Sequence, residues 1–374
     1  MVSGARLTVG VEEEYLLADP DSRLVRPVAD TVIADAATEL GHRVGTEITQ
    51  FQVEARTDPR TELADLGDQI RHMRSTVAGA AATREVRAIS SGTAVLGELV
   101  PPPISTGQRY ASSVETFRAL DDEQSACSCH VHIGLADRAV ALQVSNHLRP
   151  WLPTLVAISA NSPYWAGRDT GYASWRTLAW MRWPAAGPPP VFHSPGHFDD
   201  LVGRLSEAGA IMDPAGVYWD VRPSTRAPTV EIRATDAATT AGETLLYAAL
   251  VRALVATALT AIDEHRHIPD PTPELLRAAY WRAARDGLTG HAVDPGTGHL
   301  VPATARADAL LTHVKAAIRH HGDTDLVERE WRRLGRHGTG ADRQRTVFRR
   351  RGQLTDVVDH LTLTATAPTE RTSA

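Results

Sequence analysis

Four short stretches of the chain each place side chains that can bind metal on one face of a predicted β-strand. They cover residues 10–15 (Gly-Val-Glu-Glu-Glu-Tyr), 50–56 (Gln-Phe-Gln-Val-Glu-Ala-Arg), 128–133 (Ser-Cys-His-Val-His-Ile) and 229–233 (Thr-Val-Glu-Ile-Arg). Because successive side chains of a strand point to opposite faces, residues two apart share a face. The residues that share a face are Glu12 with Glu14, Gln52 with Glu54 and Arg56, His130 with His132, and Glu231 with Arg233.

The residues on the opposite faces of these stretches are largely apolar, with Glu13 as the exception. This pattern predicts a single sheet that lays one face on a hydrophobic core. The other face of the sheet then carries carboxylates, imidazoles and arginines.

Carboxylates and imidazoles on one face are suited to binding divalent cations. Mg²⁺ takes oxygen ligands, and Mn²⁺ accepts imidazole as well. The candidate ligands are Glu12, Glu14, Glu54, His130 and Glu231. Each group has a plainer explanation when taken singly, since a Glu-x-Glu pair can be solvated charge at a sheet edge and Glu231 with Arg233 can be a salt bridge worth little. The combination of four such groups favours a metal site.

A zinc site is the competing interpretation of the region around residue 130, where two cysteines accompany two histidines. Structural zinc needs all four ligands to converge on one point. The strand alternation places Cys127 and Cys129 on the face opposite to His130 and His132, which argues against zinc.

The chain has 39 basic residues, and Lys315 is its only lysine. A phosphate-binding loop of the G-x-x-x-x-G-K-[ST] type is therefore absent from the sequence. Any phosphate handled by this protein must be held by arginines and metal ions.

The composition is that of a globular enzyme. The chain has 374 residues, of which 43% are apolar and 22% charged, and these fractions are ordinary for a folded protein with a large core. A net charge of −6 offers no basic surface for nucleic acid. No apolar run approaches the ~20 residues of a membrane span, no signal-peptide core is visible, and two cysteines do not suggest a disulfide scaffold. We expect a cytoplasmic enzyme with small-molecule substrates and neither a nucleic-acid nor a membrane partner.

Hydrophobic periodicity and turn residues predict the other elements. Further strands or hairpins are expected at 7–17, 44–56 and 86–92, and helices at 28–40, 61–84, 139–158 (interrupted near Pro150 and Pro153), 241–263, 273–285, 303–320, 324–335 and 341–361. Residues 161–200 are expected to be mostly loop. Strands and helices do not alternate regularly, so an α+β fold is favoured over a doubly wound sheet.

Several motifs, in order along the chain, resemble those of one family, the bacterial carboxylate–amine ligases or type 2 glutamate–cysteine ligases. The motifs are Gly10–Tyr15, Gln52–Pro59, Cys129–Gly134, Asn161–Trp165, Gly167–Arg176, Asp220–Ser224, Thr229–Arg233, Trp281–Arg285 with Gly287-Leu288, and Gly338–Arg345. Together they extend over about residues 7 to 362. Ser128 departs from the pattern, because glycine is usual at that position.

The resemblance implies a glutamine synthetase-like or guanido kinase-like fold, with a largely antiparallel catalytic sheet and helices packed on one face. It also implies the use of ATP and of two or more Mg²⁺ (or Mn²⁺) ions. In this superfamily ATP phosphorylates a carboxylate, and an amine then displaces the phosphate to form an amide. Residues 1–365 are expected to form one catalytic domain, helical over about 241–362, with a disordered tail at 366–374 and a homodimeric assembly.

The resemblance also implies roles for individual residues. Metal ligands would be Glu12, Glu14, Glu54 and Glu231, with His130 on the nucleotide-bound metal. His132 would contact nucleotide or phosphate, Arg233 would lie beside the transferred phosphoryl group, and Arg222 would bind phosphate or carboxylate. Less specific candidates for nucleotide contacts are Arg168, Tyr172, Arg176 and Arg343. Five tryptophans of the middle third, at positions 165, 175, 180, 183 and 219, are expected in the core or at a dimer interface.

The function predicted from this sequence is ATP-dependent ligation of the γ-carboxylate of glutamate to an amine such as cysteine. Two alternatives use the same ligands, namely a metal-dependent amide hydrolase and a guanidino-type phosphotransferase. A third alternative is a nucleotide-binding protein without catalysis. Nothing in the sequence identifies the acceptor amine.

Overall fold

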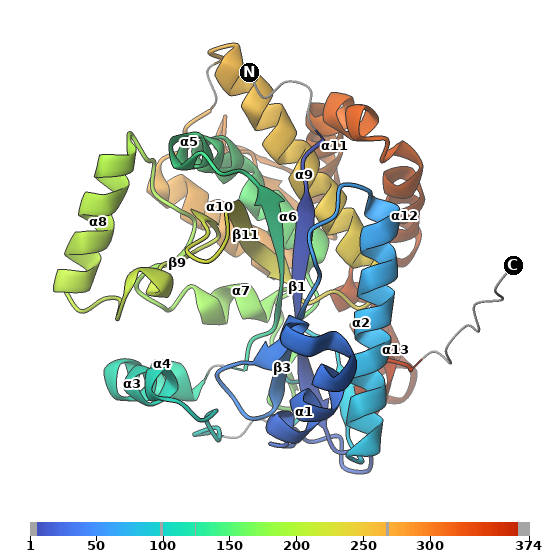
Figure 1. Ribbon diagram of the computed structural model, residues 1–374. Coiled ribbons are helices and arrows are strands. Elements are labelled where there is room, and N and C mark those ends of the chain that lie inside the picture. The colour runs from blue at the N-terminus through green and yellow to red at the C-terminus, as the bar shows by residue number, and fades with distance from the viewer. Residues whose placement is uncertain (1–5, 98–99, 124, 267–268, 366–374) are drawn as a thin grey trace, which may run out of the picture.

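A seven-stranded sheet forms the centre of the computed structural model, which describes residues 6–97, 100–123, 125–266 and 269–365 (Figure 1). The strand order is β10-β11-β5-β1-β3-β2, with β4 paired to the last residues of β1, and all neighbouring strands are antiparallel. These strands are β1 Val9–Ala18, β2 Val44–Thr46, β3 Gln52–Arg56, β4 Arg87–Ile89, β5 Ser128–Gly134, β10 Val221–Pro223 and β11 Thr229–Asp236. The predicted α+β class with an antiparallel sheet is confirmed.

Six further strands form two-stranded pairs outside this sheet. They are β6 Tyr164–Trp165 with β7 Arg168–Asp169, β8 Ala186–Gly187 with β9 Tyr218–Trp219, and β12 His291–Val293 with β13 Leu300–Pro302. The pair β8-β9 is parallel, and the other two pairs are antiparallel.

The helices gather mainly on one side of the sheet. They are α1 Ala29–Leu40, α2 Leu63–Thr83, α3 Gln108–Phe117, α4 Ala119–Asp122, α5 Arg138–Leu148, α6 Leu152–Ser159, α7 Trp175–Trp180, α8 Pro195–Glu207, α9 Ala241–Asp263, α10 Pro273–Asp286, α11 Ala303–His321, α12 Thr324–His337, α13 Gly340–Arg351 and α14 Leu354–Leu361. Short 3₁₀ turns occur at Gly41–Arg43, Arg149–Trp151 and Pro214–Gly216.

The apolar face of the sheet packs on α9, which crosses behind the central strands in Figure 1. One continuous core joins Val11, Val131 and Ile232 of three neighbouring strands to Leu246 and Leu250 of α9, and all five are at most 1% exposed. Burial of this apolar surface supplies the main stabilisation of the fold, at roughly 25 cal/mol per Å². The predicted division of the sheet into an apolar face and a polar face is confirmed.

Glu13, the exception in the sequence pattern, points into the core and is neutralised there. Its carboxylate accepts hydrogen bonds from Arg74 Nε of α2 (2.9 Å), from Thr244 Oγ1 of α9 (2.6 Å) and from the Tyr15 hydroxyl (2.6 Å). The pair of Glu13 and Arg74 therefore ties β1 to two helices inside the core. Burial opposes ionisation of Glu13, but Arg74 outweighs it and lowers the pKa of this carboxyl.

Helix α9 differs from the sequence expectation in one respect. Its 23 residues are long and apolar enough to cross a membrane, whereas no such run was expected. Most of the apolar stretch of α9 is buried inside the protein, as in the central helix of a globular core.

Residues 161–200 lie mostly outside helices and strands, as predicted. This stretch also holds the short elements β6, β7, α7 and β8 and the beginning of α8, which were not predicted. Prolines and glycines dominated the prediction, although Ser194 followed by Pro195 is an ordinary helix start, and Ser194 Oγ accepts from the His197 amide.

The predicted helix at 341–361 is divided by Gly352, which has φ of 69°. The predicted interruption of the helix at 139–158 is confirmed at Arg149–Trp151. The tail at 366–374 lies outside the described residues.

Candidate active site

The polar face of the sheet forms the floor of a cavity of about 660 Å³. The lining includes every predicted metal ligand and four other predicted site residues: Glu12, Glu14, Glu54, His130, His132, Arg176, Arg222, Glu231 and Arg233. A volume of this size is typical of a small-molecule site. The alternation of the four strands therefore identified one real surface.

Strand register brings these side chains together across the sheet. Glu12 of β1 lies opposite His130 of β5, and Glu231 of β11 lies opposite His132. On the other side of β1, Glu14 lies opposite Glu54 of β3. Directly paired side chains of an antiparallel sheet are about 4.5–5.5 Å apart at Cβ. The two members of each pair can therefore bind the same cation or the same substrate group.

Glu12, His132 and Glu231 form the tightest group. One ligand atom from each lies within 4.8 Å of the other two, which is the spacing of groups around one cation. His132 Nε2 is buried and has no hydrogen-bond partner among the described residues, and the Glu12 Oε2 atom is 3.5 Å away. Two carboxylates and an imidazole are suitable donors for Mn²⁺, and the oxygens are suitable for Mg²⁺. The residues present therefore fit a divalent cation.

Ser128 links His130 to Glu14, and the sequence did not indicate this role. Its amide and its hydroxyl donate to the two oxygens of Glu14, at 2.8 and 2.7 Å. Since the hydroxyl hydrogen is used there, His130 Nε2–H is the donor in the 2.7 Å contact with Ser128 Oγ. His130 Nδ1 then presents a lone pair 3.4 Å from Glu12 Oε2. His130 Nδ1 and Glu12 Oε2 are thus two acceptors that face each other, which is the arrangement of two ligands that bind one cation.

Burial and the nearby Arg233 lower the pKa of His130 to about 4. The imidazole is therefore neutral near pH 7, which is the form that binds metal. For Glu12, burial acts against ionisation, but the interactions with the side chains of His130 and His132 outweigh it and hold its pKa below the ordinary range. Glu12 is thus an anion beside a neutral imidazole.

Two arginines share the carboxylate of Glu231. Arg222 Nε donates to it at 2.9 Å, and Arg233 Nη1 donates to its other oxygen. Burial would raise the pKa of Glu231, but Arg233 and then Arg222 outweigh it and lower the pKa. Arg233 Nε is buried and has no partner within the described part of the chain, so it retains a donor for an anion. The arrangement has the charge and the donors to bind phosphate oxygens.

Glu47 is a cavity residue that the sequence did not reveal. It follows β2 in a connecting segment, where no strand alternation marks it, and it forms a hydrogen-bonded carboxyl pair with Glu54. Burial and the charge of Glu12 raise the pKa of Glu54 to about 7. Burial and the neighbouring carboxylates Glu14 and Glu54 also raise the pKa of Glu47. The pair therefore holds a proton under neutral conditions.

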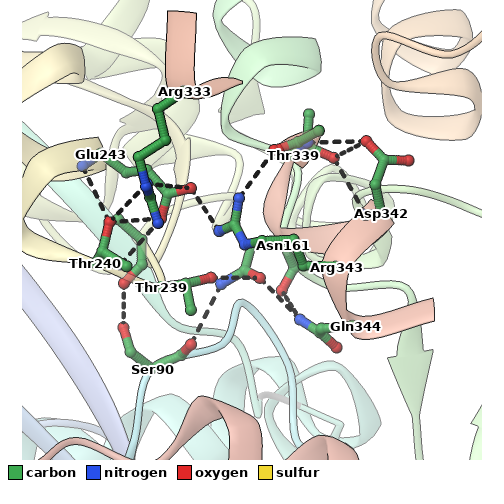
Figure 2. Close-up of polar contacts among 12 residues, drawn as sticks. Ser90, Asn161, Thr239, Thr240, Glu243, Arg333, Thr339, Asp342, Arg343 and Gln344 are labelled. Carbon is green, nitrogen blue, oxygen red and sulfur yellow. Dashed lines mark hydrogen bonds and ion pairs between the residues drawn. The ribbon is translucent and has the colours of Figure 1, made fainter. Parts of the chain in front are cut away.

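The remaining predicted residues lie in different places. Arg176 is 3% exposed and lines the cavity, where its Nη2 donates to the carbonyl of Arg233 at 3.0 Å. Arg168 is exposed and lies 5.4 Å over the Trp165 ring, away from the cavity lining. Arg343 of α13 pairs with Glu243 of α9, as Figure 2 shows, and also lies outside the lining.

Tyr172 likewise contacts α10 rather than the cavity, since its hydroxyl accepts from Trp281 Nε1 at 3.1 Å. Cys127 and Cys129 are both 0% exposed and pack in hydrophobic clusters. The tightest ligand group among the described residues contains no cysteine.

The family is shown by the comparisons with known proteins. The model of glutamate–cysteine ligase family 2 matches residues 8–360. The chain is 44% identical over 363 residues to a candidate glutamate–cysteine ligase 2-2 of Mycobacterium sp. (strain KMS), covering 95% of this chain and 97% of the relative. It is 42% identical over 364 residues to a candidate glutamate–cysteine ligase 2-1 of Saccharopolyspora erythraea, covering 97% and 96%.

Solved structures have the same fold at much lower sequence identity. The glutamate–cysteine ligase of Francisella tularensis, solved in complex with AMP, matches with a TM-score of 0.69 at 11% identity, over 95% of this chain and 87% of that one. A bifunctional glutathione synthetase from Pasteurella multocida gives 0.70 at 12% identity, and this chain, 95% of which is covered, spans about half (51%) of that protein. The family model and the close relatives together establish that this chain belongs to glutamate–cysteine ligase family 2.

Proposed function

We propose that this protein is an ATP-dependent carboxylate–amine ligase that joins the γ-carboxylate of glutamate to an amine such as cysteine. The observation that carries the proposal is the group of Glu12, His132 and Glu231 on one sheet face, with Arg222 and Arg233 beside it. The names of the close relatives supply the substrate pair, glutamate and cysteine.

A divalent cation would be held by Glu12, His132 and Glu231, with His130, Glu14 and Glu54 available for a second ion. When bound, such ions neutralise the charge that repels a carboxylate from the phosphates of ATP. Side chains of this protein would bind the transferred phosphoryl group and accept the proton of the amine.

The reaction has two steps. A γ-carboxylate oxygen of glutamate forms a bond to the terminal phosphorus of ATP, and ADP leaves with the electron pair of the broken P–O bond. The amine nitrogen then bonds to the acyl carbon, and phosphate leaves together with the original carboxylate oxygen. Arg233 Nε would donate to the transferred phosphoryl group, since it is buried with no partner among the described residues. Donors directed at such developing charge contribute about 10²–10³ in rate.

The amine must lose a proton as the C–N bond forms. Glu47, whose pKa is raised by burial and by the carboxylates of Glu14 and Glu54, is suited to take that proton once the Glu47–Glu54 pair has released its own. Both carboxyls line the cavity that would receive the substrates. The acceptor amine is expected to approach from this side of the sheet.

The test is incubation of the protein with ATP, Mg²⁺, glutamate and a panel of amines that includes cysteine. We expect ADP and a new amide to form together, and we expect Glu12→Gln to lose both products. Amide cleavage without ATP would favour the hydrolase, and ADP formation without an amide would favour the phosphotransferase. ATP binding without turnover for every amine would indicate a non-catalytic nucleotide-binding protein.

A further inference from the structure

A polar cluster joins the beginning of α13 to the segment after α6 (Figure 2). Gln344 of α13 is fully buried, and its Nε2 donates to both the backbone carbonyl and the Oδ1 atom of Asn161, at 2.9 and 2.8 Å. Asn161 Nδ2 in turn donates to the carbonyls of Ala237 (2.7 Å) and Ser90 (3.2 Å). Asn161 is thus fixed from three directions.

Gly340 allows this close approach. A Cβ atom at this position would lie 2.0 Å from Asn161 Oδ1, which is inside contact distance. The amide of Ala341, the next residue, donates to the carbonyl of Ala160 at 2.9 Å. The helix end therefore touches the backbone of the 160–161 segment directly, and glycine is required for it.

The cluster continues from Asn161 to the end of β11. The backbone amide of Asn161 donates to Asp236 Oδ2 at 2.9 Å, and Ser162 Oγ donates to the same oxygen at 2.7 Å. Ser174 Oγ donates to the other oxygen of Asp236 at 2.8 Å. Asp236 is 1% exposed, and all of these contacts are made inside the protein.

From Asp236 the contacts reach the active-site cavity through Arg176. The Arg176 amide donates to Ser162 Oγ at 3.1 Å, and its Nη1 atom lies 3.9 Å from Asp236 Oδ1. Arg176 Nη2 donates to the carbonyl of Arg233 at 3.0 Å, next to the predicted phosphoryl-binding guanidinium. Arg176 therefore connects the buried cluster to the cavity wall.

We propose that Gln344, Asn161 and Asp236 are positioning residues that hold Arg176, and through it Arg233, in the geometry that the ligase reaction requires. This role explains why residues 161–176 and 338–345, which are distant in sequence, meet at this cluster. The proposal rests on the proposed function for its kinetic consequence only, because the placement of Arg176 can be measured separately.

The kinetic test is a double-mutant cycle between Gln344 and Arg176. The value of kcat/KM for ADP formation, with glutamate, Mg²⁺ and an accepted amine, is measured for wild type, Gln344→Met, Arg176→Lys and the double variant. Methionine keeps the length of glutamine but donates no hydrogen bond. Gln344→Met is expected to lower kcat/KM about tenfold in the wild-type background and less than about twofold with Arg176→Lys, because residues of one network are not additive. Equal losses in both backgrounds would overturn the positioning role.

Val347→Ala is the matched control on the same helix. Val347 packs on a hydrophobic cluster that includes Val357 and Leu361, and its apolar side chain takes no part in the hydrogen bonds around Asn161. The control is expected to lower the unfolding midpoint as much as Gln344→Met while keeping kcat/KM within about twofold, as for an independent site. If Val347→Ala lost activity in proportion to its loss of stability, the lower stability of Gln344→Met would be enough to explain its lower activity. That result would refute the proposal.

Crystal structures of the two variants provide a readout without turnover. In Gln344→Met the 3.0 Å contact between Arg176 Nη2 and the Arg233 carbonyl is expected to be lost, whereas Val347→Ala keeps it. An unmoved Arg176 in Gln344→Met would contradict the proposal. If the wild type formed no ADP with any amine, the proposed function would fail, and a displaced Arg176 would still support the positioning role.

Discussion

Replacing Glu54 by glutamine should stabilise the metal-free protein at neutral to alkaline pH. Burial and the charge of Glu12 raise the pKa of Glu54 to about 7, from an ordinary value of 4.5. The folded chain therefore keeps this proton up to about pH 7, whereas the unfolded chain releases it near pH 4.5. Stability is lost as pH rises through this window, because the native state binds more protons than the unfolded state.

The magnitude follows from the two pKa values. Each tenfold change in acidity is worth about 1.4 kcal/mol, so the ionised Glu54 costs the folded protein about 3 kcal/mol as an upper bound. Glutamine resembles the protonated acid and carries no such cost at any pH. We expect Glu54→Gln to be more stable than wild type by up to about 3 kcal/mol near pH 8 and nearly equal near pH 4.

The assay is urea unfolding in the presence of EDTA at both pH values. Glu12→Gln is the control of opposite sign, because the interactions with His130 and His132 outweigh burial and lower the pKa of Glu12. The ionised Glu12 contributes stability above about pH 4.5, so its replacement should destabilise the protein near pH 8. A Glu54→Gln variant less stable than wild type near pH 8 would refute the reasoning. So would a change in the free energy of unfolding that has the same sign and size for Glu54→Gln and Glu12→Gln.

Three further predictions concern Arg233, Glu13 and the two cysteines. Arg233→Lys should lower kcat for glutamate-dependent ADP release by about a hundredfold or more, since a lysine has one nitrogen and cannot both pair with Glu231 and donate to the phosphoryl group as the guanidinium does; unchanged kcat would remove Arg233 from the site. Glu13→Gln should destabilise the protein by about 3–5 kcal/mol in urea unfolding, because it leaves the Arg74 guanidinium unpaired in the core; a loss below 1 kcal/mol would contradict this role. Cys127 and Cys129 are both 0% exposed, and burial raises the pKa of each thiol, so Ellman's reagent should react with them only when the protein unfolds; rapid labelling of native protein would disprove their placement.

Strand alternation predicted the polar face because it depends only on local geometry. Glu12, His130 and Glu231 are separated by about a hundred residues, yet each lies in a short strand with an apolar opposite face, and this pattern placed them on one surface. The register pairs Glu12 with His130 and Glu231 with His132. It depends on how whole strands pack against one another, so local residue spacing could not predict it. The tightest ligand group includes His132, whereas the sequence favoured His130, and which histidine binds metal stays a prediction.

The residues that were missed lie where no periodic pattern exists. Glu47 follows a three-residue strand, and Ser128 was noted only as a departure from glycine, although it joins Glu14 to His130. Asp236 lies past a bulge in β11, so alternation from Glu231 does not reach it. Their roles come from long-range contacts, which local spacing does not specify.

Oxygen transfer tests directly whether the sheet face activates a glutamate carboxylate as an acyl phosphate. The protein is incubated with ATP, Mg²⁺, cysteine and glutamate that carries ¹⁸O in its γ-carboxylate, and the released phosphate is analysed by mass spectrometry. The proposed mechanism predicts one ¹⁸O atom in each phosphate for every amide formed, because the carboxylate oxygen leaves with phosphorus. Amide formation with phosphate that contains no ¹⁸O would contradict it.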